Sequence, residues 1–167
     1  MKLHRTYFNS FSSKPDPFRV YLESWKRQLP AMELMEWNES NVDLDVNDWV
    51  KRAARDRAPV FISEFVRWKA LHDHGGLYLD ADIEVVNGHK ITELVQECLD
   101  SEDYDAFVGV ESLGNGAPTA QTVFSKGKSD LVDFMLDLYE SRLEPLWIWR
   151  ETRGLIGPQL MSLYFYE

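Results

Sequence analysis

Two aspartates separated by one residue, Asp80 and Asp82, are the strongest candidates for chemistry in this sequence. The apolar run that starts at Leu77 predicts a short buried strand that ends at Asp80. In α/β proteins the carboxyl ends of such strands open onto the ligand crevice. Two carboxylates at this point can bind one hard cation, Mg²⁺ or Mn²⁺, with water and phosphate oxygens in the remaining positions. The pair alone is also common in solvated turns, so the neighbouring sequence has to decide between the two.

A second polar pair, Glu64 and Arg67, lies in a segment that predicts a largely buried helix over residues 59–74. The spacing of three places both side chains on one face, where their charges need polar partners. Arginine suits a phosphate or a carboxylate, and glutamate suits hydroxyl groups. Because two glycines end the helix directly before the Asp80 strand, we expect both pairs beside one crevice. An ion pair within the helix is the alternative interpretation.

The charge balance limits the classes of partner. The 167 residues carry 18 Lys and Arg against 28 Asp and Glu, which gives a net charge of −10 and a pI near 4.9. A protein this acidic is a poor candidate for nucleic-acid binding, which depends on neutralising phosphates. We therefore expect no nucleic-acid partner.

The length and the apolar content bound the architecture. The 167 residues, 44% of them hydrophobic, predict one folded domain over residues 1–167. No apolar run reaches the roughly 18–20 residues that span a bilayer, and no signal-like segment opens the chain. A single cysteine, Cys98, excludes an internal disulfide. We expect a cytoplasmic protein, with peripheral contact to a membrane left open.

The apolar pattern predicts strands that alternate with helices. We expect strands at residues 3–8, 32–37, 77–80, 105–110 and 119–125, with residues 83–86 also extended. We expect helices at residues 17–29, 48–57, 59–74, 91–99, 129–139 and 160–166. This alternation predicts an α/β fold with a mainly parallel, Rossmann-like sheet flanked by helices.

The segment from Ser63 to Asp82 resembles the core of a known family. It reads S-E-x-x-R, a helical spacer, and G-G-L-Y-L-D-A-D, which is similar to the S-D-x-x-R … G-G-x-Y-x-D-x-D core of DXD-containing sugar transferases. These are the mannosyltransferases, capsular-polysaccharide glycosyltransferases and α1,4-glycosyltransferases of glycosyltransferase family 32, and the glucosylating clostridial toxins share the same core. The run from Leu3 to Phe8 resembles the opening strand of these enzymes more weakly.

This resemblance implies a GT-A nucleotide-sugar fold and a metal-dependent, retaining transfer of a hexose. The donor would be a UDP- or GDP-sugar, and the acceptor would be a glycan or another hydroxyl compound, as in surface polysaccharide synthesis. By the same resemblance, Asp82 would bind Mn²⁺ or Mg²⁺ directly, and Asp80 would reach the metal through water and contact ribose or sugar hydroxyls. Arg67 and Glu64 would hold the donor sugar. Glu64 replaces the aspartate of the family and is longer by one methylene group.

The resemblance also assigns a nucleotide pocket. Ser63 and Tyr78 would line it, and Tyr7 would stack on the base in place of the tryptophan that is usual in the family. Relatives complete the metal shell with a loop near the carboxyl terminus. We expect that element to be short here, because the sequence ends soon after Gly157-Pro158.

Two other functions fit parts of the same segment. A haloacid-dehalogenase-type phosphatase would use Asp80 as nucleophile and Asp82 as acid and base, and it would need a downstream lysine such as Lys126 or Lys128. A module that binds a nucleotide sugar without turnover is the third hypothesis. Binding of a nucleoside diphosphate, release of sugar and hydrolysis of a phosphate ester distinguish the three.

Overall fold

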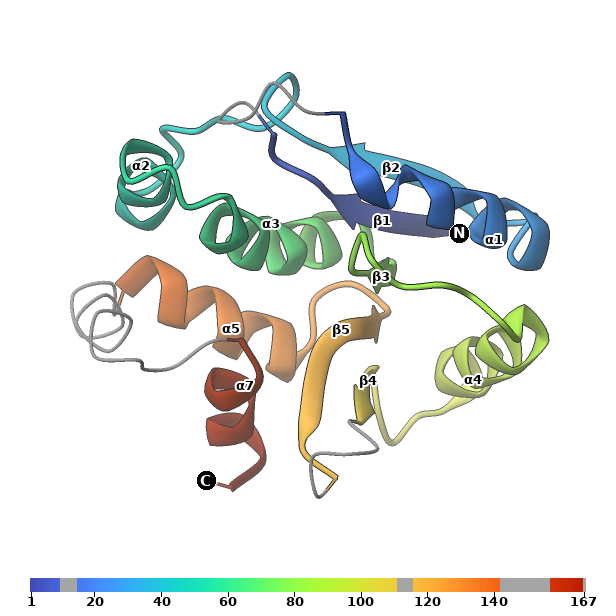
Figure 1. Cartoon of the computed structure of the whole chain (residues 1–167). Helices are drawn as coiled ribbons and strands as arrows, with labels where there is room; N and C mark the ends of the chain where they lie inside the picture. Colours follow the sequence, from blue (N-terminus) through green and yellow to red (C-terminus); the bar gives the residue numbers. More distant parts are fainter. Residues whose placement is uncertain (10–14, 111–115, 142–156, 167) are drawn as a thin grey trace.

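A computed structural model describes residues 1–9, 15–110, 116–141 and 157–166. Within these residues five strands form one sheet in the order β2-β1-β3-β5-β4 (Figure 1). The strands are β1 (Lys2–Thr6), β2 (Glu33–Trp37), β3 (Gly76–Leu79), β4 (Ala106–Val110) and β5 (Pro118–Ser125). The expected α/β fold is confirmed.

The sheet is mixed, so the expectation of a mainly parallel sheet is only partly right. Strand β1 is parallel to both β2 and β3, whereas β5 is antiparallel to both β3 and β4. The reason is the length of the β4–β5 connection. Only seven residues separate Val110 from Pro118, and a parallel pair needs a crossover of about a dozen or more.

Helices cover both faces of the sheet. On one face lie α1 (Leu22–Gln28), which continues the 3₁₀ helix η1 (Pro17–Tyr21), and α4 (Gly88–Asp100). On the other face lie α2 (Asp48–Arg55), α3 (Pro59–His74), α5 (Asp130–Ser141) and α7 (Gly157–Tyr166) (Figure 1). None of the described helices is both long and apolar enough to cross a membrane.

Strand β3 contributes to the core on both faces because successive side chains point in opposite directions. Leu77 and Leu79 pack with Trp25 and Val95 under α1 and α4. Tyr78 packs on the opposite face, in the cluster that contains Trp68 of α3. Because β3 is the central strand, its end lies in the middle of the sheet edge.

The expected helix over residues 59–74 is confirmed with the same bounds, and two glycines connect it to β3. Gly75 has φ +60°, and a Cβ there would lie 2.7 Å from the carbonyl oxygen of Lys126. Gly76 has φ +108°, and a Cβ there would collide with the carbonyl oxygen of Lys2. Only glycine fits such positions without strain. The tight connection brings the buried face of α3 directly against the strand that carries Asp80.

Candidate functional site

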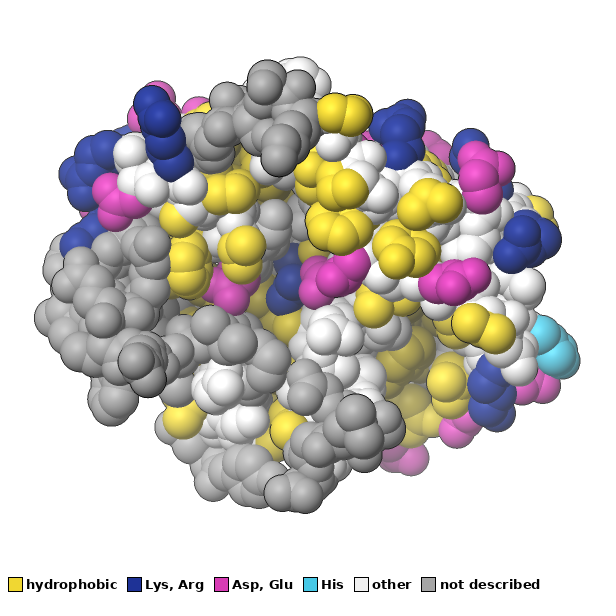
Figure 2. Space-filling view, in the orientation of Figure 1, with side chains coloured by type: hydrophobic (Ala, Val, Ile, Leu, Met, Phe, Trp, Pro, Cys, Tyr) yellow, Lys and Arg dark blue, Asp and Glu magenta, His cyan; other side chains and the backbone are white. Residues whose placement is uncertain are grey.

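A cavity of about 650 Å³ opens at the carboxyl ends of β1 and β3. These two parallel strands end at the same edge of the sheet, as the sequence predicts for Asp80. The lining residues are Thr6, Tyr7, Phe8, Asn9, Pro15, Pro17, Phe18, Arg57, Pro59, Val60, Ser63, Arg67, Asp80, Ala81 and Asp82. Figure 2 shows this face of the molecule, where hydrophobic side chains gather around basic and acidic groups near the centre. We call the cavity lined by these residues the main cavity.

Two buried groups fix one oxygen of Asp80, and a third supports one of the two. Arg67 Nη2 donates to Asp80 Oδ1 over 2.7 Å, and the Tyr78 hydroxyl donates to the same oxygen over 2.8 Å. The Thr6 Oγ1 atom lies 2.7 Å from the Tyr78 hydroxyl and is the donor there, because the tyrosine proton points to Asp80. Within the described residues, Asp80 Oδ2 makes no hydrogen bond, so this second oxygen remains available to a ligand.

The charge on Arg67 is stabilised by its surroundings. Its side chain is only 7% exposed, and its guanidinium carbon lies 4.7 Å from the centre of the Tyr78 ring. Burial alone would lower the pKa of Arg67, but Tyr78, Asp80 and Glu64 raise it and keep the group charged. Burial raises the pKa of Tyr78, so its hydroxyl stays protonated and can donate to Asp80.

Asp82 occupies a different environment from Asp80. It lies in the turn after β3, it is exposed, and its side chain makes no hydrogen bond or ion pair with another described residue. Among the described residues, no group of three or more His, Cys, Asp or Glu side chains is placed to hold a metal ion. Within the residues that the structure describes, a cation here would rest on the carboxylates of Asp80 and Asp82. This donor set fits Mg²⁺ or Mn²⁺, which keep several waters and accept phosphate oxygens.

Two of the residues expected in a nucleotide pocket, Tyr7 and Ser63, line the main cavity. The Tyr7 ring makes an edge contact with Phe18 at 6.1 Å, and the Arg5 guanidinium lies 5.3 Å from its centre. Burial and the nearby charge of Asp16 raise the pKa of Tyr7. The Tyr7 hydroxyl is therefore protonated. Its ring forms part of the cavity wall and is held between Phe18 and Arg5.

The sequence-predicted residues are brought together, but not all of them reach the cavity. Five of the seven line it: Tyr7, Ser63, Arg67, Asp80 and Asp82. Tyr78 is fully buried beneath Asp80 and supports it from below. Glu64 is 5% exposed, and its charge acts on Arg67 one turn further along α3.

Sequence reasoning missed two contributors, Thr6 and Arg57. Thr6 acts through Tyr78, a residue 72 positions away, and no local sequence pattern predicts such a contact. Arg57 follows α2 and has φ 53°, and it lines the main cavity. The only signal for it was its place in the basic stretch before α3.

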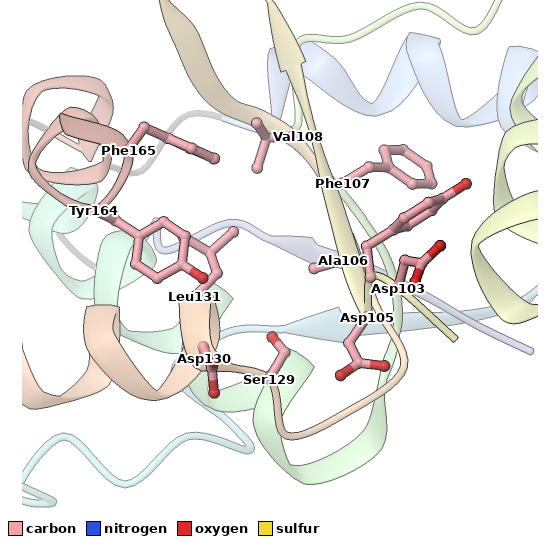
Figure 3. A pocket seen from close by; sticks show the side chains of 11 residues that line it. Asp103, Asp105, Ala106, Phe107, Val108, Ser129, Asp130, Leu131, Tyr164 and Phe165 are labelled. Carbon is pink, nitrogen blue, oxygen red and sulfur yellow. The ribbon is translucent and has the colours of Figure 1, made fainter. Parts of the chain in front are cut away.

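A second cavity of about 350 Å³ lies between β4, α5 and α7 (Figure 3). Tyr164 and Leu131 form its apolar wall, and the carboxylates of Asp105 and Asp130 lie at its edge. None of the predicted site residues lines it. The predicted site residues therefore gather at the main cavity and not at this second one.

A family described as "Glycosyltransferase sugar-binding region containing DXD motif" matches residues 15–104, more than half of the chain. The chain belongs to this family. The matched segment includes Asp80, Ala81 and Asp82, together with Ser63, Glu64, Arg67 and Tyr78. The expected relationship to DXD glycosyltransferases is confirmed at this level.

The fold is similar to that of the solved structure titled "PaToxG Glycosyltransferase". The TM-score is 0.73 at 11% sequence identity, over 99% of this chain and 68% of the other. At such low identity the similarity establishes the fold. No curated protein matches the chain by sequence.

Proposed function

We propose that this protein is a metal-dependent, retaining glycosyltransferase of glycosyltransferase family 32. It transfers a hexose from a UDP- or GDP-sugar to a hydroxyl group of a glycan or similar acceptor, as a cytoplasmic enzyme of surface polysaccharide synthesis. The observation that carries this proposal is the pairing of a fixed Asp80 with an unpartnered Asp82 at the end of the central strand, within the part of the chain that the structure describes. The family match supports glycosyl transfer in general.

Each residue of the main cavity has a part in this reaction. Asp82 would bind the cation directly and Asp80 through water, while Asp80 Oδ2 accepts a ribose or sugar hydroxyl. When bound, Mg²⁺ or Mn²⁺ would offset the charge that develops on the leaving diphosphate. Arg67 and Glu64 hold the donor sugar, and Arg67 also keeps Asp80 in place.

The nucleotide lies against the other wall of the cavity. Tyr7 stacks on the base, and Ser63 of α3 lines the pocket. Tyr78 lies beneath the cavity wall and donates to Asp80. The apolar residues around Phe18 exclude water from the base. These contacts would fix the orientation of the donor in the cavity.

The phosphatase alternative is less consistent with the placement of Lys126, one of the two lysines that it could use. Lys126 follows Ser125, which pairs with Gly76 at the start of β3, whereas Asp80 follows the other end of that strand. Lys126 Nζ donates to the carbonyl of Ser101 over 2.7 Å and lies 3.2 Å from Asp105 Oδ1. It is therefore engaged away from Asp80, which supports the transferase.

The test is thermal stabilisation by UDP and GDP, with and without Mn²⁺, followed by release of sugar from the matching donors. We expect stabilisation that depends on the metal and disappears in Asp82→Ala. Asp130→Ala is the matched control, because it removes one exposed carboxylate from the second cavity. Stabilisation without sugar release would indicate a silent binding module, and an aspartyl-phosphate at Asp80 would establish the phosphatase.

A further inference from the structure

Arg57, between α2 and α3, has an unusual backbone conformation. Its φ is 53°, and it is the only residue other than glycine with a positive φ in the described part of the chain. Two backbone bonds hold it there: Arg57 N donates to Ala54 O over 3.1 Å, and Ala58 N donates to Ala53 O over 2.8 Å. This bond pair is typical of a helix end at which glycine takes the left-handed position. An arginine in this place is strained relative to glycine.

The Arg57 side chain is directed to the main cavity. It is exposed, it lines the cavity, and it makes no hydrogen bond or ion pair with any other described residue. The nearby Arg55 differs in two ways. Arg55 Nε lies 3.3 Å from Asp56 Oδ1, and Arg55 does not line the cavity. The strained residue is thus the one whose five N–H donors remain available to a ligand.

Arg57 lies at the end of the cavity remote from the aspartates. Val60, Ser63 and Arg67 line the cavity along one face of α3, and Arg67 contacts Asp80. From Pro59 to Arg67 the helix rises by roughly 12 Å, and Arg57 precedes Pro59 by two residues. A nucleotide whose diphosphate lies at the aspartates therefore extends along α3 and brings its base toward Arg57.

We propose that Arg57 selects the nucleobase of the donor by donating hydrogen bonds to a keto oxygen. This inference rests on the proposed function. Arginine only donates, so it pairs with O4 of uracil or O6 of guanine and leaves the amino groups of cytosine and adenine unpaired. Discrimination of this kind is strong when a polar group of the site loses its partner.

Four nucleoside diphosphates test the inference as two matched pairs. UDP and CDP differ in a keto oxygen against an amino group, and so do GDP and ADP. We expect the unmodified chain, with Mn²⁺, to bind at least one keto member on the order of 10- to 100-fold more tightly than its amino counterpart. In Arg57→Gly this ratio should fall to about 1, while the melting temperature rises because glycine adopts the left-handed conformation without strain. Arg55→Ala removes the same charge away from the cavity and should keep the ratio.

The other outcomes overturn the inference. An unchanged ratio in Arg57→Gly would give Arg57 a structural role alone. An equal loss of affinity for all four nucleotides would make it a general positive charge. If the unmodified chain bound CDP and ADP as well as it binds UDP and GDP, no base selection would exist. If it bound none of the four, the proposed function itself would be wrong, and the inference would fall with it.

Discussion

Two polar clusters on the same face of the β1–β3 pair differ in how completely their atoms are hydrogen-bonded. At one end, His4 is fully buried, Trp37 Nε1 donates to its Nδ1 over 3.1 Å, and its Nε2 lies 2.8 Å from Gly75 O. At the other end, Thr6, Tyr78 and Arg67 surround Asp80. The first cluster satisfies both ring nitrogens of His4. The second leaves Asp80 Oδ2 and Arg67 Nε without partners among the described residues.

This difference separates a cluster that only stabilises the fold from one that can also bind a ligand. Buried polar groups that are fully satisfied stabilise one conformation, and groups with unused capacity are where a ligand gains affinity. The His4 cluster is neutral and lies away from the main cavity. The Asp80 cluster carries charges and forms the cavity wall. Substitutions in the two clusters should therefore affect stability and ligand binding in different proportions.

The largest effect is expected for Arg67→Met, which leaves the Asp80 carboxylate without its ion-pair partner. The free energy of unfolding should fall by about 3 kcal/mol, near the lower end of the range for a broken buried pair, because Asp80 is 27% exposed. Nucleotide affinity should fall as well. Urea unfolding of Arg67→Met, of Asp80→Asn and of the double variant measures the coupling between the two residues.

The double variant decides how this loss arises. In the Asp80→Asn background, Arg67→Met should lower the free energy of unfolding by much less than it does in the otherwise unmodified chain. If Arg67→Met cost the same in both backgrounds, the lost stability would come from packing and not from an uncompensated charge.

The sequence predicts those features of the site that depend on residues close together in the chain. The bounds of α3, the glycine connection and the position of Asp80 at the end of β3 all follow from residues 59–82. Helix periodicity and the conformational freedom of glycine act locally, so a single sequence shows them. The antiparallel β5 also follows from a local property, the short β4–β5 connection, although the strand-and-helix alternation favours a parallel sheet.

The rest of the site depends on pairing between distant strands. Thr6 reaches the Tyr78 hydroxyl only because β1 and β3 pair with His4 opposite Tyr78. The positive φ of Arg57 depends on how α2 ends against α3. The residue type alone would predict a negative φ at this position. Such features are decided by tertiary packing and cannot be read from one sequence.

A smaller effect is expected for Tyr78→Phe, which removes the hydroxyl between Thr6 and Asp80. The free energy of unfolding should fall by about 1 kcal/mol, the net value of a hydrogen bond. Metal-dependent binding of a nucleoside diphosphate should weaken several-fold, because Asp80 loses one of its two orienting donors. Urea unfolding and calorimetric titration measure the two losses separately.

Tyr139→Phe is the matched control for this substitution. Tyr139 is also fully buried, but its hydroxyl has no hydrogen-bond partner among the described residues. Its removal should leave both stability and binding nearly unchanged. If the two variants behaved alike, the chain from Thr6 through Tyr78 would have no role in holding Asp80.

The smallest effect is the pH-dependent change in stability expected at the His4 end, which develops on acidification. Burial, together with the charges of His74 and Lys2, lowers the pKa of His4 below its ordinary value of 6.5, despite the opposing bond to Gly75. The unfolded chain therefore binds a proton more readily, and the stability that neutral His4 provides is lost as pH falls from about 6.5 toward the folded-state pKa. Protonation would place a hydrogen on Nδ1, which accepts from Trp37. The stability difference between the unmodified chain and His4→Gln should narrow below pH 6.5, by at most about 1.4 kcal/mol per pH unit. The other titratable groups are present in both proteins, so their contributions cancel in this difference. If the difference in free energy of unfolding stayed constant from pH 7 to pH 5, His4 would be protonated to the same extent in the folded and unfolded chains. The proposed contrast between a neutral His4 cluster and a charged Asp80 cluster would then be wrong.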